Sequence, residues 1–168
     1  MLFFSFQSNA QQITWQCYNV VIDNPAAFTA VWDDFMQTDI GKSMSANAIF
    51  QFDFASSEFS STHQVCWFSD NPADLEENFI KFSNAKTMNT AGIWETWNEE
   101  VEQESAILGQ SLIADPAGFD LQFAVVYSIN VKDPGTYAAA FTEMKAAAEA
   151  SNGGQGTLEL HEVLAGGE

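Results

Sequence analysis

The chain contains no arginine. Its five basic residues are all lysines, set against 23 aspartates and glutamates among 168 residues, and the formal net charge is −18. Without guanidinium groups the chain cannot form bidentate clamps on phosphate or carboxylate. Because so strong a negative charge repels phosphates, nucleic acid and anionic membrane surfaces are disfavoured as partners.

Long apolar runs are also absent, since none approaches the roughly 18 residues that a membrane-spanning helix needs. Residues 1–11 begin with a short apolar stretch that no lysine precedes, yet Ser8 and Ala10 have the spacing of a signal-peptide cleavage site. Residues 1–11 are therefore interpreted as a signal-peptide remnant or a short hydrophobic arm. The sequence leaves open whether the protein is cytoplasmic or is periplasmic or secreted.

Cysteine and histidine are scarce, with two residues of each. His63 is interpreted as structural, whereas His161 stands beside Glu159 and Glu162 and could join an acid–base pair. Two histidines on different predicted faces are too few for a zinc or haem site, so no metal or cofactor is predicted. Without a Cys-x-x-Cys motif, a redox-catalytic thiol is not predicted either.

Aromatic residues, in contrast, are abundant: they make up 14% of the chain, with fifteen phenylalanines and five tryptophans. This content is too high for a disordered acidic chain. The length allows one domain or two small repeated halves, with enough chain to bury a core. We therefore expect a folded, acidic globular protein.

The four prolines all follow asparagine or aspartate. These two residues cap helix N-termini, and proline fits the first helical position. Three of the prolines stand between a strand-like run and an amphipathic run, and they predict strand-to-helix junctions at Pro25, Pro72 and Pro134. After Pro25, apolar residues recur with helical spacing at Phe28, Val31, Trp32 and Phe35.

The sequence also shows an internal repeat. Residues 17–22 and 126–131 are matching strand-like runs, and each precedes a junction, a helix and a further strand. The first copy, residues 12–87, continues to the order βαββα, and residues 88–114 are predicted as a linker helix. The second copy, residues 121–168, stops after βαβ, so we expect the chain to be a fragment of a longer protein.

Tandem βαββα units of this size resemble the ferredoxin-like fold, and specifically the dimeric α/β-barrel superfamily. The resemblance implies an α+β protein in which two sheets face one another, here with a shortened second repeat. The superfamily includes monooxygenases, haem-degrading enzymes and isomerases, together with many proteins of unknown function. The fold therefore implies no single activity.

Alternate residues of each predicted strand lie on opposite faces, one under the helices and one open. In the superfamily that the chain resembles, the open face lines the barrel interior where ligands bind. Phe50 is expected on the face under the helices. Its neighbour Gln51 is then expected on the open face. The predicted ligand-binding residues are Trp15, Asn19, Gln51, Asp53, Phe68, Ser128, Asn130 and His161.

The two cysteines fall on this same open face. In a ferredoxin-like unit the strands that carry Cys17 and Cys66 are antiparallel neighbours, so we expect their Cα atoms within about 7 Å. In an oxidising compartment they would form a disulfide. The alternative is that they are two small buried apolar residues.

The sequence is compatible with two functions. The first is a non-enzymatic module that uses the open face to bind a small apolar or aromatic ligand, or to assemble. The alternative is a cofactor-independent monooxygenase- or isomerase-like enzyme that uses Asn19, Asp53, Asn130 or His161 for proton transfer. Self-association, or a shifted pairing against the first copy, is expected because residues 157–163 lack their neighbouring strand.

Overall fold

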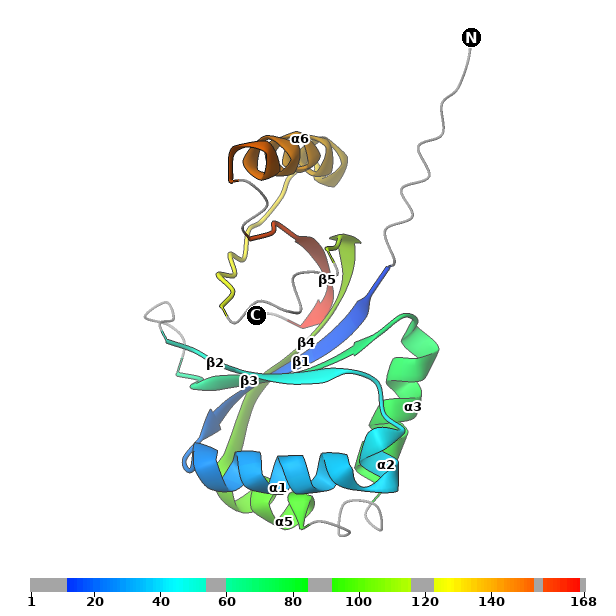
Figure 1. Ribbon diagram of the computed structural model, residues 1–168, viewed down its shortest axis with the longest axis vertical. Coiled ribbons are helices and arrows are strands. Elements are labelled where there is room, and N and C mark those ends of the chain that lie inside the picture. Colours follow the sequence, from blue (N-terminus) through cyan, green and yellow to red (C-terminus); the bar gives the residue numbers. More distant parts are fainter. Residues whose placement is uncertain (1–11, 54–59, 85–91, 116–122, 153–155, 167–168) are drawn as a thin grey trace. The chain divides into compact units, whose positions relative to one another are not determined.

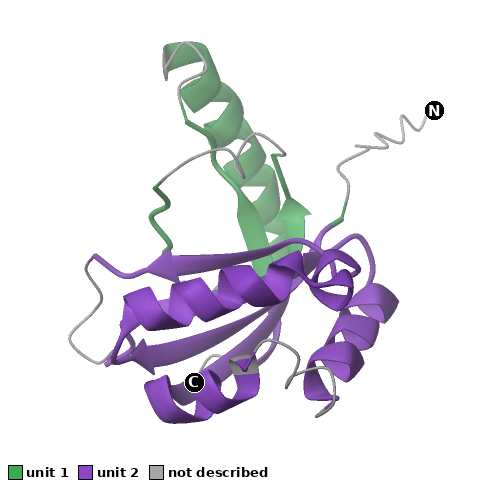
Figure 2. Cartoon of the chain, turned by 60° about the horizontal axis from the view of Figure 1, so that its bottom comes forward, with its two compact units in different colours: residues 1–12, 110–162 green, residues 13–109, 163–168 purple. Residues whose placement is uncertain are grey.

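The computed structural model describes residues 12–53, 60–84, 92–115, 123–152 and 156–166; the predicted signal-peptide remnant, residues 1–11, lies outside them. The protein is α+β, with one antiparallel five-stranded sheet in the order β2-β3-β1-β4-β5 (Figure 1). The chain divides into two compact units, a larger one of residues 13–109 with 163–168 and a smaller one of residues 1–12 with 110–162 (Figure 2).

The larger unit contains most of the regular structure. Its strands are β1 (Thr14–Ile22), β2 (Asn47–Gln51), β3 (His63–Ser69) and most of β4 (Val101–Ile113). Its helices are α1 (Pro25–Gln37), α2 (Asp39–Lys42), α3 (Pro72–Ser83) and α5 (Ile93–Glu100). The smaller unit holds α6 (Pro134–Asn152) and the first residues of β5 (Leu160–Gly166).

Three helices begin at a proline, as the sequence predicts: α1, α3 and α6 start at Pro25, Pro72 and Pro134. The side chains of the preceding Asn24, Asn71 and Asp133 accept hydrogen bonds from first-turn backbone N–H groups, at 3.0–3.2 Å. Each bond satisfies a donor that has no partner inside the helix. The predicted helix starts are confirmed.

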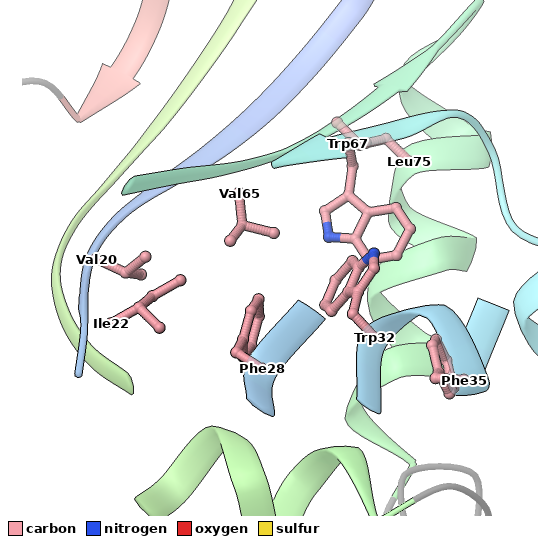
Figure 3. Close-up of a cluster of buried hydrophobic side chains, with 8 residues drawn as sticks. All are labelled: Val20, Ile22, Phe28, Trp32, Phe35, Val65, Trp67 and Leu75. Atoms are coloured by element: carbon pink, nitrogen blue, oxygen red, sulfur yellow. The ribbon is translucent and has the colours of Figure 1, made fainter. Parts of the chain in front are cut away.

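Helices α1, α3 and α5 cover one face of β1 and β3 and enclose the core of the larger unit (Figure 1). The buried apolar side chains of this core are Val20, Ile22, Phe28, Trp32, Phe35, Val65, Trp67 and Leu75 (Figure 3). The ring centroid of Trp32 lies 5.4 Å from that of Trp67, and its Nε1 donates to Asn47 Oδ1 at 2.9 Å. The indole thereby packs α1 against the sheet without leaving its N–H unsatisfied.

The linker helix predicted over residues 88–114 is wrong for most of its length. Helix α5 ends at Glu100, residues 101–113 form strand β4, and residues 85–91 lie outside the described part. Strand β4 lies beside β1 in the sheet. Glutamate, glutamine, alanine and leucine favour a helix locally, but pairing with a strand about 90 residues earlier is a non-local contact that overrides this preference.

The strand predicted over residues 126–131 is not formed. Residues 123–131 are exposed, and in the described part of the chain they belong to no strand of the sheet. The second half contributes α6 and β5, and β5 pairs with β4 at the edge of the sheet. From the sequence, either self-association or a shifted pairing against the first copy is expected for this last strand. The pairing of β5 with β4 is the second of these alternatives.

Strand β2 has the opposite parity from the predicted one. Ile49 lies in register with Val65 and packs against the core, whereas Phe50 is on the other face and is 41% exposed. Gln51 pairs with His63 and so shares the helix-covered face. A shift of one residue exchanges the two faces of a strand, and the spacing of phenylalanines does not determine how β2 aligns with β3.

His63 lies on this helix-covered face and makes the stability of the fold depend on pH. The residue is only 7% exposed, and its Nδ1 lies 2.8 Å from Thr62 Oγ1. Burial lowers the pKa of the imidazole below its ordinary value. Protonation therefore favours the unfolded chain, where the pKa is about 6.5. The stability that depends on neutral His63 is present above that pH and is lost as the pH falls below it.

We expect the substitution His63→Gln to remove this part of the pH dependence. The free energy of unfolding of the wild type, measured in urea from about pH 7.5 to about pH 5, should fall relative to that of the variant as the pH decreases. Because both proteins carry the same carboxylates, taking the difference cancels their shared titration. A difference that stays constant over this range would show that His63 does not titrate as expected.

Candidate functional site

The candidate site is the face of the sheet that points away from α1 and α3, here called the open face. Trp15 in β1 and Phe68 in β3 are register partners on this face, and both side chains are half-buried. Phe50, on the edge strand β2, is in register with Gln64 and so joins the same face. Three aromatic side chains thus line one side of three adjacent strands.

A disulfide lies on the open face between these strands. Cys17 and Cys66 are register partners whose Cα atoms are 4.1 Å apart, and their sulfur atoms are bonded. The pairing predicted from strand parity is therefore confirmed. Both residues are buried, and with both sulfurs in the bridge no thiol is left to act as a nucleophile. The bridge fixes the register of β1 and β3 at the middle of the face.

A row of three polar side chains crosses β3, β1 and β4 beside the disulfide. Gln64 Nε2 donates to Asn19 Oδ1 at 2.8 Å, and Asn19 Nδ2 donates to Ser105 Oγ at 3.0 Å. Asn19 is only 1% exposed, so its amide is held by these two partners. Amide and hydroxyl groups do not ionise near neutral pH. The row can position a ligand through Gln64 and Ser105, which are half-buried, but it holds no acid or base.

Strand β4 also positions Trp15. A Cβ atom at Gly109 would overlap the indole ring of Trp15, so the close approach of β4 requires glycine at this position. The sequence predicts neither Ser105 nor Gly109 as a site residue, because it predicts a helix for the segment that carries them. Gly109 is itself a signal against that helix, since glycine is unfavourable in a helix interior.

Three of the eight predicted ligand-binding residues lie together on the open face: Trp15, Asn19 and Phe68. Two others do not join them. Gln51 shares the helix-covered face with His63, and Asp53 is an exposed residue beyond the end of β2. The remaining three belong to the smaller unit, namely Ser128 and Asn130 in the exposed residues 123–131 and His161 in β5.

In the smaller unit Lys145 and His161 each lie close to carboxylates. Lys145 Nζ lies 2.9 Å from Glu149 Oε1 and 3.1 Å from Asp115 Oδ2, and His161 Nε2 lies 3.1 Å from Glu159 Oε2. Burial acts to lower the pKa of Lys145, but the hydrogen bonds to the two carboxylates raise it above its ordinary value. Lys145 is therefore a charged structural partner rather than a base.

Comparison of the chain with protein-family models, with curated proteins and with solved structures gives no match. Within the described ranges, no helix is long and apolar enough to cross a bilayer. In the same residues, no group of three or more histidine, cysteine, aspartate or glutamate side chains is arranged to hold a metal ion.

Proposed function

We propose that the chain is a non-enzymatic binding module whose open face takes a small neutral molecule of apolar or aromatic character. The observation that carries this proposal is the set of Trp15, Phe50 and Phe68 on one sheet face, beside a polar row that does not ionise. Apolar and aromatic walls with a few fixed polar groups are the usual lining of small-molecule sites.

Charge narrows the ligand class further. The chain carries a net charge of −18, and so strong a negative field repels anions. The half-buried polar groups of the open face are the Gln64 amide and the Ser105 hydroxyl, which suit a carbonyl or hydroxyl group on the ligand. A neutral ring system with one or two such groups fits this chemistry.

The alternative, a cofactor-independent monooxygenase- or isomerase-like enzyme, has less support. Proton transfer needs an ionisable group within hydrogen-bond reach of the ligand. Asn19 is held by two neutral partners, and Asp53 lies exposed beyond the end of β2. Both cysteines are in the disulfide. The disulfide itself favours an oxidising compartment as the place where the protein works.

We also infer that the larger unit is a ferredoxin-like domain. The described chain follows the order β1, α1, β2, β3, α3 and β4, with the short α2 and α5 inserted, and β4 lies beside β1. A βαββαβ order with the two helices on one face is the ferredoxin-like pattern. On this inference β4 is the last strand of the first unit rather than a connection between two copies.

The binding proposal is tested by titrating the protein with a neutral apolar dye, Nile red, and following its fluorescence. The substitution Phe50→Ser should weaken dye binding by about tenfold, because it removes one aromatic wall of the face. Phe79→Ser is the matched control, since Phe79 is 53% exposed on α3 and lies outside the open face. Equal binding by both variants would show that the open face is not the site.

A further inference from the structure

Residues 123–131 form an exposed apolar strip in the smaller unit. Phe123, Val126 and Tyr127 are 79%, 82% and 80% exposed, and Val125 and Ile129 are 60% and 59% exposed. In the part of the chain that the structure describes, no strand of the sheet contains these residues. Single exposed apolar residues are ordinary, whereas a continuous strip of them marks an interaction surface.

The strip has the residue pattern of a half-buried strand. Every odd-numbered residue is apolar: Phe123, Val125, Tyr127, Ile129 and Val131. The residues between them are small or polar apart from Val126, and Lys132 is the first charged residue beyond the strip. β-Branched and aromatic residues favour strands, but a strand needs a neighbour to satisfy its backbone N–H and C=O groups.

We propose that residues 123–131 pair antiparallel with the same residues of a second copy of the chain, about a two-fold axis at Tyr127. In this register Phe123 lies opposite Val131 of the partner subunit, and Val125 lies opposite Ile129 of the partner subunit. Each odd-numbered apolar residue then faces another odd-numbered apolar residue, and cross-strand pairs of this kind stabilise antiparallel strands. The arrangement is the isologous contact that closes a symmetric dimer.

Self-complementarity makes a second copy the occupant that fits this strip best. The odd-numbered apolar positions are arranged symmetrically on the two sides of Tyr127. In an antiparallel pair centred on Tyr127, both chains therefore present these positions to each other in the same register. The backbone N–H and C=O groups of the strip, which lie in no strand of the described sheet, would find partners in this register as well. No charge is placed inside this contact.

The net charge of −18 opposes the approach of two copies and gives the interface a distinctive salt dependence. Charges separated by more than about 8 Å are screened at physiological ionic strength. An apolar contact between two strongly negative chains should therefore tighten as salt rises. A contact made by ion pairs, such as one with a cationic partner, would weaken instead.

The test is light scattering after size exclusion, applied to the full chain over a range of protein and salt concentrations. The mass of the wild type should approach twice the 18.5 kDa of one chain as both concentrations rise. Tyr127→Lys should raise the dissociation constant of the dimer at least about 30-fold, because two ammonium groups then meet at the axis. Tyr127 is exposed, so the substitution does not put folding at risk.

Ser128→Lys is the matched control, because it adds the same charge one residue away on the opposite side of the strand. This variant should leave the dimer largely intact.

Oxidative cross-linking gives a second readout of the same contact. Tyr127→Cys should link two chains much faster than Ser128→Cys, because only position 127 faces its own copy across the axis.

Four results would overturn the inference. Three are a mass of one chain under all conditions, a dimer that survives Tyr127→Lys, and equal cross-linking at positions 127 and 128. The fourth is a dimer that weakens as salt rises, which would indicate ion pairing. The Nile red titration reports on the open face of the larger unit. It therefore tests the proposed ligand binding independently of the proposed dimer.

Discussion

Replacing both Cys17 and Cys66 by alanine is expected to lower the free energy of unfolding by about 4 kcal/mol. The two cysteines are 49 residues apart in the sequence, and closing a loop of that length removes much conformational entropy from the unfolded chain. Both are buried, so the alanines keep an apolar environment. Urea unfolding of the double variant and the wild type measures the difference.

Reduction provides the control for this prediction. A thiol reductant should lower the stability of the wild type by a similar amount and should leave the double variant unchanged, because the variant has no bridge to lose. The free thiols of the reduced wild type are counted by mass spectrometry after alkylation. If the fully reduced protein unfolds at the same urea concentration as the oxidised protein, the bridge does not stabilise the fold.

The second large effect is expected from Phe28→Ala in the core of the larger unit. Phe28 is fully buried, and its ring centroid lies 5.6 Å from that of Trp32 and 5.7 Å from that of Trp97. Its removal leaves a cavity where α1 and α5 meet the sheet (Figure 3). The free energy of unfolding should fall by about 4 kcal/mol, as is usual for a buried phenylalanine.

Phe79→Ala is the control for this substitution, because it removes the same side chain from a position that is 53% exposed on α3. Its effect should stay within about 0.5 kcal/mol. Both variants are compared with the wild type by urea unfolding followed through tryptophan fluorescence. Equal losses of stability in the two variants would contradict the placement of Phe28 at the centre of this core.

Phe28 and the disulfide lie on opposite faces of the same strands. The core fixes how the helices pack beneath β1 and β3, and the disulfide fixes how these strands align on the open face. Between them the sheet holds Trp15 and Phe68 opposite each other, at the face proposed to bind a ligand. Such preorganisation favours binding, since less ordering is required when the complex forms.

The sheet face of each residue in β1 and β3 is predicted correctly from the sequence. Each strand alternates clearly, so the sequence predicts Trp15, Asn19, Phe68 and both cysteines on one face, as the register has them. The prediction failed at Gln51, because the parity of β2 depends on its alignment with β3. The sequence does not indicate Ser105, because the residues of β4 have the local preference of a helix.

The amino-acid sequence by itself determined the features that depend on neighbours along the chain. Asparagine or aspartate before proline places the starts of α1, α3 and α6, since a cap involves residues only three positions apart. The apolar spacing after Pro25 likewise determines which side of α1 is buried.

Only the tertiary structure decided which extended segments become strands. Residues 101–113 have local helical preference, yet they pair with β1, where Asn19 meets Ser105. Residues 123–131 have a clear strand pattern, yet no strand of the described sheet contains them. The physical reason is that a helix satisfies its backbone hydrogen bonds within itself, whereas a strand satisfies them only through a partner elsewhere in the chain or in another molecule.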